Sequence, residues 1–154
     1  MSDFAIQPDR VDRPAVAAVI ARHHALMRAS SPAESCHVMD ASELSEAGAV
    51  LFSVTDGDVV LGIGALKEIA PGHGEIKSMH VTAEARGRGL SKALLSALLA
   101  EAGDRNMTQI SLETGSQEVF QAACRLYETF GFHVCAPFAD YVDDPNSVFM
   151  SLAL

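Results

Sequence analysis

Residues 50–81 contain three strand-like runs, which are separated by two tight-turn signals. The pair Asp56-Gly57 follows the first run and is a strong hairpin signal, because both residue types accept the positive φ of a tight turn. The sequence Pro71-Gly72-His73-Gly74 separates the second run from the third. Strands joined by tight turns pair antiparallel, so the runs 50–55, 58–69 and 75–81 predict an antiparallel meander.

Strands and helices alternate after this meander, and the pattern before it is also mixed. Amphipathic patterns predict helices over 90–102 and 117–130. The other predicted elements are strands at 2–7, 108–113, 132–136 and 148–152, and helices at 12–30 and 42–47. The order β-α-α-β-β-β-α-β-α-β-β predicts an α/β (α+β) fold, with a mixed, mostly antiparallel sheet of about seven strands and helices on both faces.

Three element ends carry local signals. Pro8 and Asp9 are expected to end the first strand, since both residue types disfavour strand interiors. Asp12 is expected to cap the first helix, because its carboxylate can accept hydrogen bonds from the first turn. Gly103 is expected to cap the helix 90–102, since glycine favours the left-handed conformation that often ends a helix.

The third strand-like run has an irregular apolar pattern. Side chains of a strand alternate between its two faces, so Met79 and Val81 lie on one face and Ile76 lies on the other. A regular strand therefore cannot place all three on one face. A β-bulge between Ile76 and Met79 would bring them to the same face. Gly62 and Gly64, in the preceding run, predict close backbone contact or a bulge there.

The composition fits one domain spanning residues 1–154. Apolar residues make up 49% of the chain and charged residues 20%, which supports a core and excludes a largely disordered chain. The net charge of −9 argues against non-specific nucleic-acid binding, because phosphate backbones need clustered cations. An anionic ligand must therefore be held by a local positive patch.

The cysteines and the apolar runs indicate the cellular context. Three cysteines leave an odd thiol if two pair, which favours a reduced, cytoplasmic protein. The N-terminal residues lack the apolar region of a secretory signal. No apolar run approaches the ~20 residues of a membrane helix, so no membrane partner is expected.

A strand, a glycine-arginine loop and a helix follow one another over residues 75–102. The helix start offers unpaired N–H groups, and Gly87 and Gly89 let a ligand approach the backbone closely. Arg86, Arg88 and Lys92 add three positive charges with no acid among them. This arrangement predicts a diphosphate site, and the alternative is a solvated, glycine-rich helix start.

Two common phosphate motifs do not match this loop. The Walker A pattern Gly-x4-Gly-Lys-Ser/Thr is absent, and Lys92 stands where the dinucleotide pattern Gly-x-Gly-x-x-Gly needs its third glycine. The histidines and cysteines show neither Cys-x-x-Cys nor His-x3-His spacing, so no metal site is expected.

Several stretches, in the right order, resemble the Gcn5-related N-acetyltransferase (GNAT) superfamily. Residues 86–91 resemble its acyl-CoA pyrophosphate loop, Gln/Arg-x-x-Gly-x-Gly/Ala, with Ser91 in the last position. Residues 75–81 resemble its fourth strand, and 126–132 resemble Leu-Tyr-Glu-x-x-Gly-Phe at the end of its last helix. Phe120 stands where an Asn that contacts CoA is common. Residues 112–115 and 140–149 resemble a bacterial subgroup of uncharacterised members.

The resemblance implies direct transfer of an acetyl group from acetyl-CoA to an amine in a ternary complex. It implies a bulge in the fourth strand, whose freed backbone groups bind the pantetheine arm and polarise the thioester carbonyl. The implied cofactor-binding residues are Met79, His80, Val81, Arg86, Gly87, Arg88, Gly89, Leu90, Ser91 and Lys92. The side chain of His80 has the opposite parity to Met79 and Val81, which favours a structural or surface role for it.

Three residues are candidates for catalysis. The resemblance makes Tyr127 the general acid near the CoA sulfur. Glu75 is a candidate general base, directly or through water, and the alternative is a solvated strand end. Glu113 is either a base or an anchor for the substrate amine, because it lies where two parallel strands would splay.

The acceptor pocket is expected between the loop after the first helix and the last hairpin. The first segment offers Ser35, His37 and Asp40. The second offers Asp140, Tyr141, Asp143 and Asp144, of which Tyr141 is expected to contact substrate. The stretch Asp143-Asp144-Pro145 is interpreted as a solvated turn.

The leading hypothesis is an acetyl-CoA-dependent N-acetyltransferase that acts on a primary amine of a small or amino-acid-like acceptor. One alternative is acetylation of a protein N-terminus or lysine, which predicts a long open groove. Another is a non-catalytic acyl-CoA sensor, which predicts binding without turnover. A homodimer is compatible with the resemblance, because last-strand edges of this fold often pair between subunits.

Overall fold

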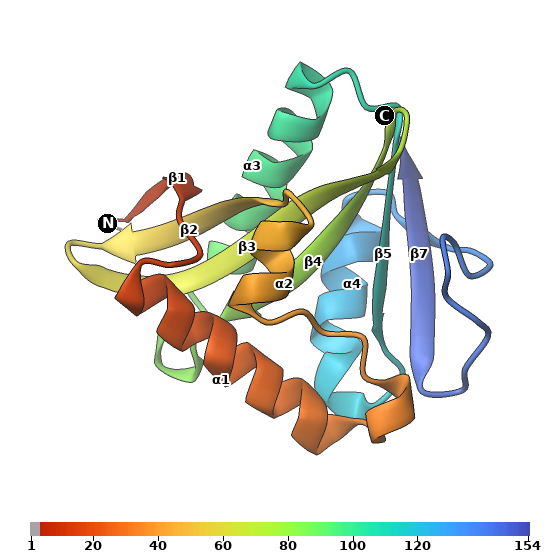
Figure 1. Cartoon of the computed structure of the whole chain (residues 1–154), viewed down its shortest axis with the longest axis horizontal. Helices are drawn as coiled ribbons and strands as arrows, with labels where there is room; N and C mark the ends of the chain where they lie inside the picture. The colour runs from red at the N-terminus through yellow and green to blue at the C-terminus, as the bar shows by residue number, and fades with distance from the viewer. Residues whose placement is uncertain (1–3) are drawn as a thin grey trace.

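A computed structural model of the protein describes residues 4–154, so the first two residues of the expected strand 2–7 lie outside the described part (Figure 1). One sheet runs through the molecule in the order β1-β2-β3-β4-β5-β7-β6. Its strands are β1 (Ala5–Asp9), β2 (Val50–Asp56), β3 (Val59–Ala70), β4 (His73–Val81), β5 (Gln109–Gly115), β6 (His133–Val134) and β7 (Ser147–Ala153). Only the β4–β5 pairing is parallel among the described strands. The predicted mixed, mostly antiparallel sheet is confirmed.

Helices cover both faces of this sheet, as predicted. The α-helices are α1 (Pro14–Ser30), α2 (Ala41–Glu46), α3 (Leu90–Asp104) and α4 (Gln121–Thr129). In Figure 1, α1 and α2 lie in front of the sheet and α4 lies behind it. The front core contains Val16 and Ile20 of α1 against Ile63 of β3. The rear core contains Leu94 and Leu98 of α3 with side chains of β2 to β5 and β7.

The predicted bulge is present in β4. Ile63 pairs with His80 and Ala65 with Lys77, so Gly64 faces two residues of the partner strand. Ser78 adopts a φ of 57°, which is the left-handed conformation of a bulged residue. As a result Ile76, Met79 and Val81 all reach the rear core.

Gly64 also confirms the predicted close approach. A β-carbon there would lie 2.7 Å from Met79 Sδ and 2.8 Å from Leu98 Cδ1. Glycine therefore lets α3 and the bulged strand pack against β3 without a void or a clash.

Three predicted element ends are wrong. Pro8 and Asp9 stay in β1 and pair with Phe52 and Leu51, because an edge strand tolerates a proline that cannot donate. Arg13, not Asp12, occupies the N-cap position of α1, since the Asp12 carboxylate pairs with Arg10 instead. The helix α3 continues through Gly103 to Asp104, because Gly103 does not adopt a positive φ.

The parallel pair opens at one end. Pairing between β4 and β5 runs from His73 and Gln109 to Ile76 and Leu112 and then stops. Both strands continue beyond this point, β4 to Val81 and β5 to Gly115. The strands therefore splay, as expected, and Glu75 and Glu113 lie close to the opening.

Substitutions at Gly115 and Gly103 test the close contact between Gly115 and the Phe120 ring. A β-carbon at Gly115 would overlap the Phe120 ring, so Gly115→Ala should lower the free energy of unfolding by about 1–3 kcal/mol. A β-carbon at Gly103 meets nothing within 4 Å, so Gly103→Ala should raise it by about 0.5–1 kcal/mol. Urea denaturation measures both changes. A Gly115→Ala variant as stable as the wild type would contradict the described contact.

Candidate active site

The loop before α3 presents a row of free backbone donors. Gly87 and Gly89 have φ values of 84° and 74°, and Gly89 is the N-cap residue of α3. None of the amides from Gly87 to Lys92 donates a hydrogen bond to another described residue. Leu90 is buried in the rear core and fixes the helix start in place. A ligand with several acceptor oxygens fits this row of N–H groups.

Positive side chains surround the same row. Arg86, Arg88 and Lys92 are exposed, and none forms an ion pair within residues 4–154. Arg22 on α1, by contrast, pairs with Glu84 at 3.0 Å just before the loop. The loop therefore combines uncompensated positive charge with a helix N-terminus, which fits a diphosphate.

The side chain of His80 contacts α1. Its Nδ1 lies 3.1 Å from Nδ1 of His23, and the two rings meet edge-on. Burial lowers the pKa of His23 to about 3, and burial and Arg22 lower the pKa of His80. Both rings are therefore neutral near pH 7, and one Nδ1 donates to the other. The structural role expected for the His80 side chain is consistent with this contact.

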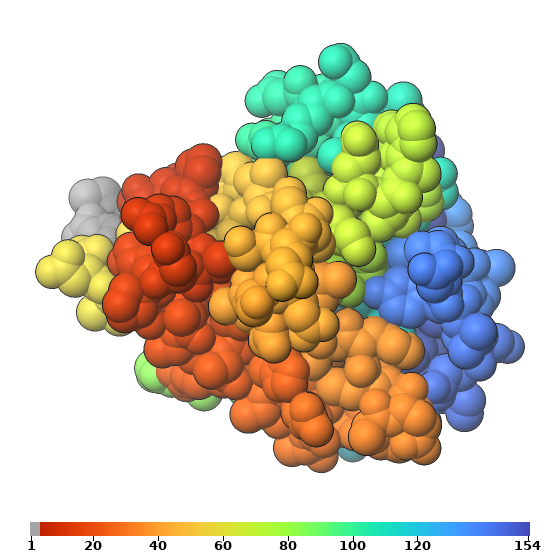
Figure 2. Space-filling model, viewed as in Figure 1, coloured from red at the N-terminus to blue at the C-terminus, as the bar shows by residue number. Residues whose placement is uncertain are grey.

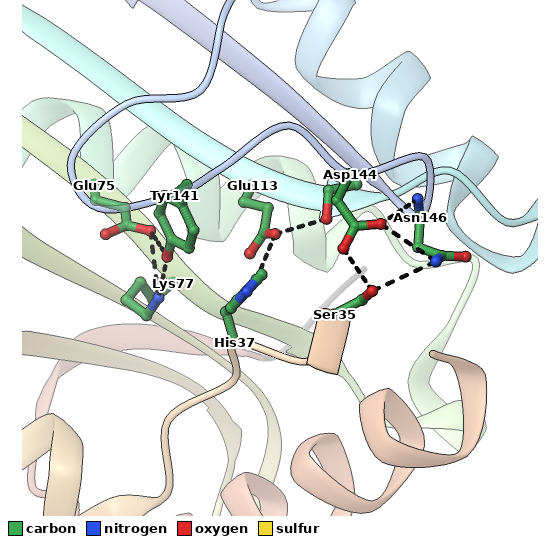
Figure 3. Close-up of polar contacts among 9 residues, drawn as sticks. Ser35, His37, Glu75, Lys77, Glu113, Tyr141, Asp144 and Asn146 are labelled. Atoms are coloured by element: carbon green, nitrogen blue, oxygen red, sulfur yellow. Dashed lines mark hydrogen bonds and ion pairs between the residues drawn. The ribbon is translucent and has the colours of Figure 1, made fainter. Parts of the chain in front are cut away.

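A polar cluster occupies the opening between β4 and β5 (Figure 3). It consists of Ser35, His37, Glu75, Lys77, Glu113, Tyr141, Asp144, Asn146 and Ser147. Its members come from the segment after α1, from the two splayed strands, and from the segment before β7 with the first residue of β7. Figure 2 shows the segment after α1, in orange, and the segment before β7, in blue, side by side on one face, although they are far apart in the sequence. The structure thus brings Ser35, His37 and Tyr141, which were expected to bind substrate, together with both candidate carboxylates, Glu75 and Glu113.

Glu75 lies in a buried triangle of side chains within this cluster. Tyr141 Oη donates to Glu75 Oε2 at 2.6 Å, and Lys77 Nζ donates to Tyr141 Oη at 2.9 Å. Lys77 Nζ also lies 3.3 Å from Glu75 Oε2, and the two side chains are only 8% and 4% exposed. Burial and the charge of Glu75 raise the pKa of Tyr141, which therefore stays protonated. The interpretation of Glu75 as a solvated strand end is wrong, because β4 begins earlier, at His73.

Glu113 holds a second part of the cluster. His37 Nδ1 lies 2.7 Å from Glu113 Oε2, and Ser147 Oγ donates to the same oxygen at 2.8 Å. The His37 ring packs edge-on against Tyr141, with 5.1 Å between the ring centroids. The cluster therefore presents an imidazole and a carboxylate as a hydrogen-bonded pair.

The turn before β7 is not simply solvated. Ser35 Oγ donates to Asp144 Oδ2 at 2.6 Å, and Asn146 binds the other carboxylate oxygen. The hydrogen bond from Ser35 and that from the Asn146 amide lower the pKa of Asp144. Asp143 is exposed as expected, and Asp40 caps α2. Asp144 thus ties this turn to the loop after α1.

Two adjoining cavities border the cluster. One, of about 60 Å³, lies in the splay and is lined in part by Ser78, Glu113 and Ser35. The other, of about 270 Å³, is lined in part by Asp140 and Tyr141. His37, Glu75 and Lys77 line both cavities. A small molecule in either cavity would lie beside these side chains.

Tyr127 stands apart from the cluster. It belongs to the rear core, where its ring meets Phe132 edge-on at 5.7 Å, and it lines neither cavity. Burial raises the pKa of its hydroxyl, which stays protonated near neutral pH. Its hydroxyl makes no hydrogen bond with another residue in the described part. The structure therefore places Tyr127 on α4, away from the polar cluster and with no hydrogen-bond partner among the described residues.

Sequence reasoning missed Lys77, Asn146 and Ser147. Lys77 shares the parity of Glu75, so strand alternation was a usable signal for it. Asn146 and Ser147 carry no local signal, because only the fold brings Asn146 to Ser35 and Ser147 to Glu113. Within residues 4–154, no group of three potential metal ligands is found, and no helix is long and apolar enough to cross a membrane.

This sheet, with its bulged strand, parallel splay and phosphate-type loop, is the architecture of acyl-CoA N-acyltransferases. A putative acyl-CoA N-acyltransferase from Klebsiella pneumoniae superimposes with a TM-score of 0.80 at 27% identity, over 98% of this chain and 97% of that one. Residues 19–132 match the Acetyltransferase (GNAT) family. The protein belongs to this family and is an N-acetyltransferase by fold and relationship.

Two curated relatives carry the same designation over nearly the whole chain. The uncharacterized N-acetyltransferase YsnE of Bacillus subtilis is 43% identical over 90% of this chain and 92% of its own length. The uncharacterized N-acetyltransferase YedL of Escherichia coli is 42% identical over 98% of this chain and 95% of its own. A putative acetyltransferase from Salmonella typhimurium, determined with acetyl-CoA, shares the fold at a TM-score of 0.72 and 22% identity, over 99% of this chain and 94% of that one.

Proposed function

We propose that the protein transfers an acetyl group from acetyl-CoA to the primary amine of a small, amino-acid-like acceptor, by direct transfer in a ternary complex. The observation that carries this proposal is the polar cluster, which sets one buried cation beside carboxylates at the splay. Lys77 lines both cavities and uses two of its three N–H donors on Glu75 and Tyr141. The third donor is free for an anionic group of the acceptor.

The donor side of the site fits acetyl-CoA. The amides of Gly87 to Lys92 and the side chains of Arg86 and Arg88 would hold the pyrophosphate. The bulge at Ser78 frees backbone groups next to Met79, and these would contact the pantetheine arm and the thioester carbonyl. Acetyl-CoA supplies the activated acetyl group when bound. Holding donor and amine in line contributes roughly 7–11 kcal/mol at best to lowering the barrier.

The acceptor side holds a positive group, Lys77, and a negative group, Glu113, at separate places. An acceptor with both an amine and a carboxylate can bind both, with its carboxylate at Lys77 and its amine near Glu113 and His37. A simple amine leaves the free donor of Lys77 unused. A hydrogen bond to a charged group contributes about 1.5–3 kcal/mol, so the acceptor carboxylate should matter about 10- to 100-fold in kcat/KM.

Matched acceptors test this proposal. We expect an amino acid to be acetylated with a kcat/KM about 10- to 100-fold above that of its primary amide, after correction for the fraction of free amine. The double variant Glu75→Gln/Lys77→Met removes both charges without leaving a buried ion unpaired. It should reduce the preference to less than about threefold.

Two results would contradict the proposed acceptor class. Equal rates for acid and amide in the wild type would contradict the amino-acid-like acceptor. Turnover with peptides alone, and with no small amine, would instead indicate acetylation of a protein N-terminus or lysine.

A further inference from the structure

We infer that His37 is the general base that accepts the acceptor's proton and that Glu113 is its positioning residue. This inference rests on the proposed function and deepens it. It differs from the expectation that His37 only contacts substrate and that a carboxylate takes the proton directly. The inference starts from the close contact between these two side chains (Figure 3).

The contact fixes the tautomer of the imidazole. His37 Nδ1 lies 2.7 Å from Glu113 Oε2, and a carboxylate can only accept a hydrogen bond. The proton of the neutral ring is therefore on Nδ1, and the lone pair is on Nε2. No described residue donates to Nε2, and the ring lines both cavities. The basic nitrogen is thus free to meet an acceptor there.

Glu113 is itself held in place. Ser147 Oγ donates to the same carboxylate oxygen at 2.8 Å, and strand β5 fixes the backbone. The Glu113 side chain is 12% exposed and that of His37 29% exposed, so the inner partner is shielded and the outer one reaches the cavities. Tyr141 packs edge-on against the imidazole and limits its rotation. A base oriented by a buried carboxylate has the arrangement that general base catalysis needs.

Other candidates for the base are already engaged. Glu75 is only 4% exposed, its charge is compensated by Lys77, and its Oε2 accepts from both Tyr141 and Lys77. His23 and His80 bind each other. His73 Nε2 bonds to Ser111 and lines neither cavity. Among the described histidines, His37 alone lines both cavities.

Charged groups face His37 from several elements. It meets Glu113 on β5, Glu75 and Lys77 on β4, and Tyr141 and Asp144 in the segment before β7. His23 on α1 lines the smaller cavity and is neutral near pH 7, since burial lowers its pKa to about 3. Asp140 and Lys67 line the larger cavity as well.

The step balances with the groups named. The ammonium of the acceptor gives one proton to His37 Nε2, and the neutral nitrogen attacks the thioester carbon. The C–N bond forms and the C–S bond breaks. The CoA sulfur leaves as a thiolate and takes the proton of Tyr127. The second proton, lost from the nitrogen once the C–N bond has formed, passes through water to the Tyr127 phenolate and restores its hydroxyl. The products are the acetylated amine, CoA thiol and the proton that the imidazolium returns to solvent.

The pH dependence of kcat/KM tests the inference, with the best acceptor of an amine panel. In the wild type, kcat/KM should rise through neutral pH to a plateau. His37→Ala should lower kcat/KM at pH 7 by about 10²–10³. Its kcat/KM should recover at high pH, where the amine loses its proton unaided. Added imidazole should restore activity to the variant at pH 7. His133→Ala, on the exposed edge strand β6, is the matched control and should change nothing.

Glu113→Gln separates positioning from a structural role. Because the glutamine is neutral, the acid limb of the profile should move to lower pH and the plateau should fall. Nitrogen NMR of the histidines in the complex with CoA gives a readout that needs no acceptor. The Nδ1-protonated tautomer of His37 should be present in the wild type and lose its preference in Glu113→Gln.

The outcomes distinguish this inference from the function on which it rests. A His37→Ala variant with an unchanged acid limb and no imidazole rescue, beside an active wild type, overturns the base while the acetyltransferase stands. A His37 ring protonated on Nε2 in the wild type overturns it as well. A wild type that binds acetyl-CoA but acetylates no amine overturns the proposed function, and the base with it.

Discussion

Replacing Tyr127 by Phe is expected to lower kcat by about 10²–10³ and to change acetyl-CoA affinity by less than about twofold. The phenylalanine keeps the ring that packs against Phe132 in the rear core. It removes only the hydroxyl, whose pKa burial raises, so that it stays protonated and can donate to the departing thiolate. Steady-state kinetics measures kcat, and calorimetry measures the affinity.

Cys124 provides the control for this variant. It lies on the same helix, and burial raises the pKa of its thiol, so it is not a thiolate nucleophile. Cys124→Ala should therefore retain kcat within about twofold. A Tyr127→Phe enzyme with unchanged kcat across the pH range would exclude Tyr127 as the general acid.

Replacing Arg86 and Arg88 together by Ala is expected to raise the Kd for acetyl-CoA by about 100-fold. Each side chain is exposed and free of ion pairs within the described residues, so the free energy of unfolding should change by less than about 0.5 kcal/mol. The loss should shrink at high salt, because salt screens exposed charges. Isothermal titration calorimetry at two salt concentrations checks both statements.

Arg125, an exposed arginine on α4, is the matched control for charge loss. Arg125→Ala should leave the Kd unchanged. An unchanged Kd in the Arg86→Ala/Arg88→Ala variant as well would remove the pyrophosphate assignment of the loop.

The sheet could be predicted from sequence because its signals are local. Tight turns at Asp56-Gly57 and around Gly72 order the meander, and the parity of Ile76 and Met79 locates the bulge. The predicted cap at Asp12 was wrong, since Arg10 binds its carboxylate through two hydrogen bonds and Arg13 takes the N-cap position. Such ion pairs depend on side-chain conformations that a capping preference does not describe.

The cofactor loop and the polar cluster also differ in how far the sequence predicts them. The loop 86–89 and the start of α3 are contiguous, so its phosphate chemistry could be predicted from the sequence alone. The polar cluster joins residues that only the fold brings together, as in the contact of His37 with Glu113. The burial of Glu75 was missed because its neighbours Lys67 and Ser111 belong to other strands. Asp144 was interpreted as part of a solvated turn, because its partner Ser35 lies far away in the chain.

The most direct test is thiol release from acetyl-CoA by the wild-type protein, measured with and without a panel of amines, amino acids, polyamines and peptides. Mass spectrometry of the reaction identifies the acetylated product. We expect release that depends on a small amine, gives equal amounts of CoA and acetylated amine, and is fastest with amino acids. Tight binding of acetyl-CoA without release for any acceptor would contradict the proposed acetyl transfer and indicate an acyl-CoA sensor.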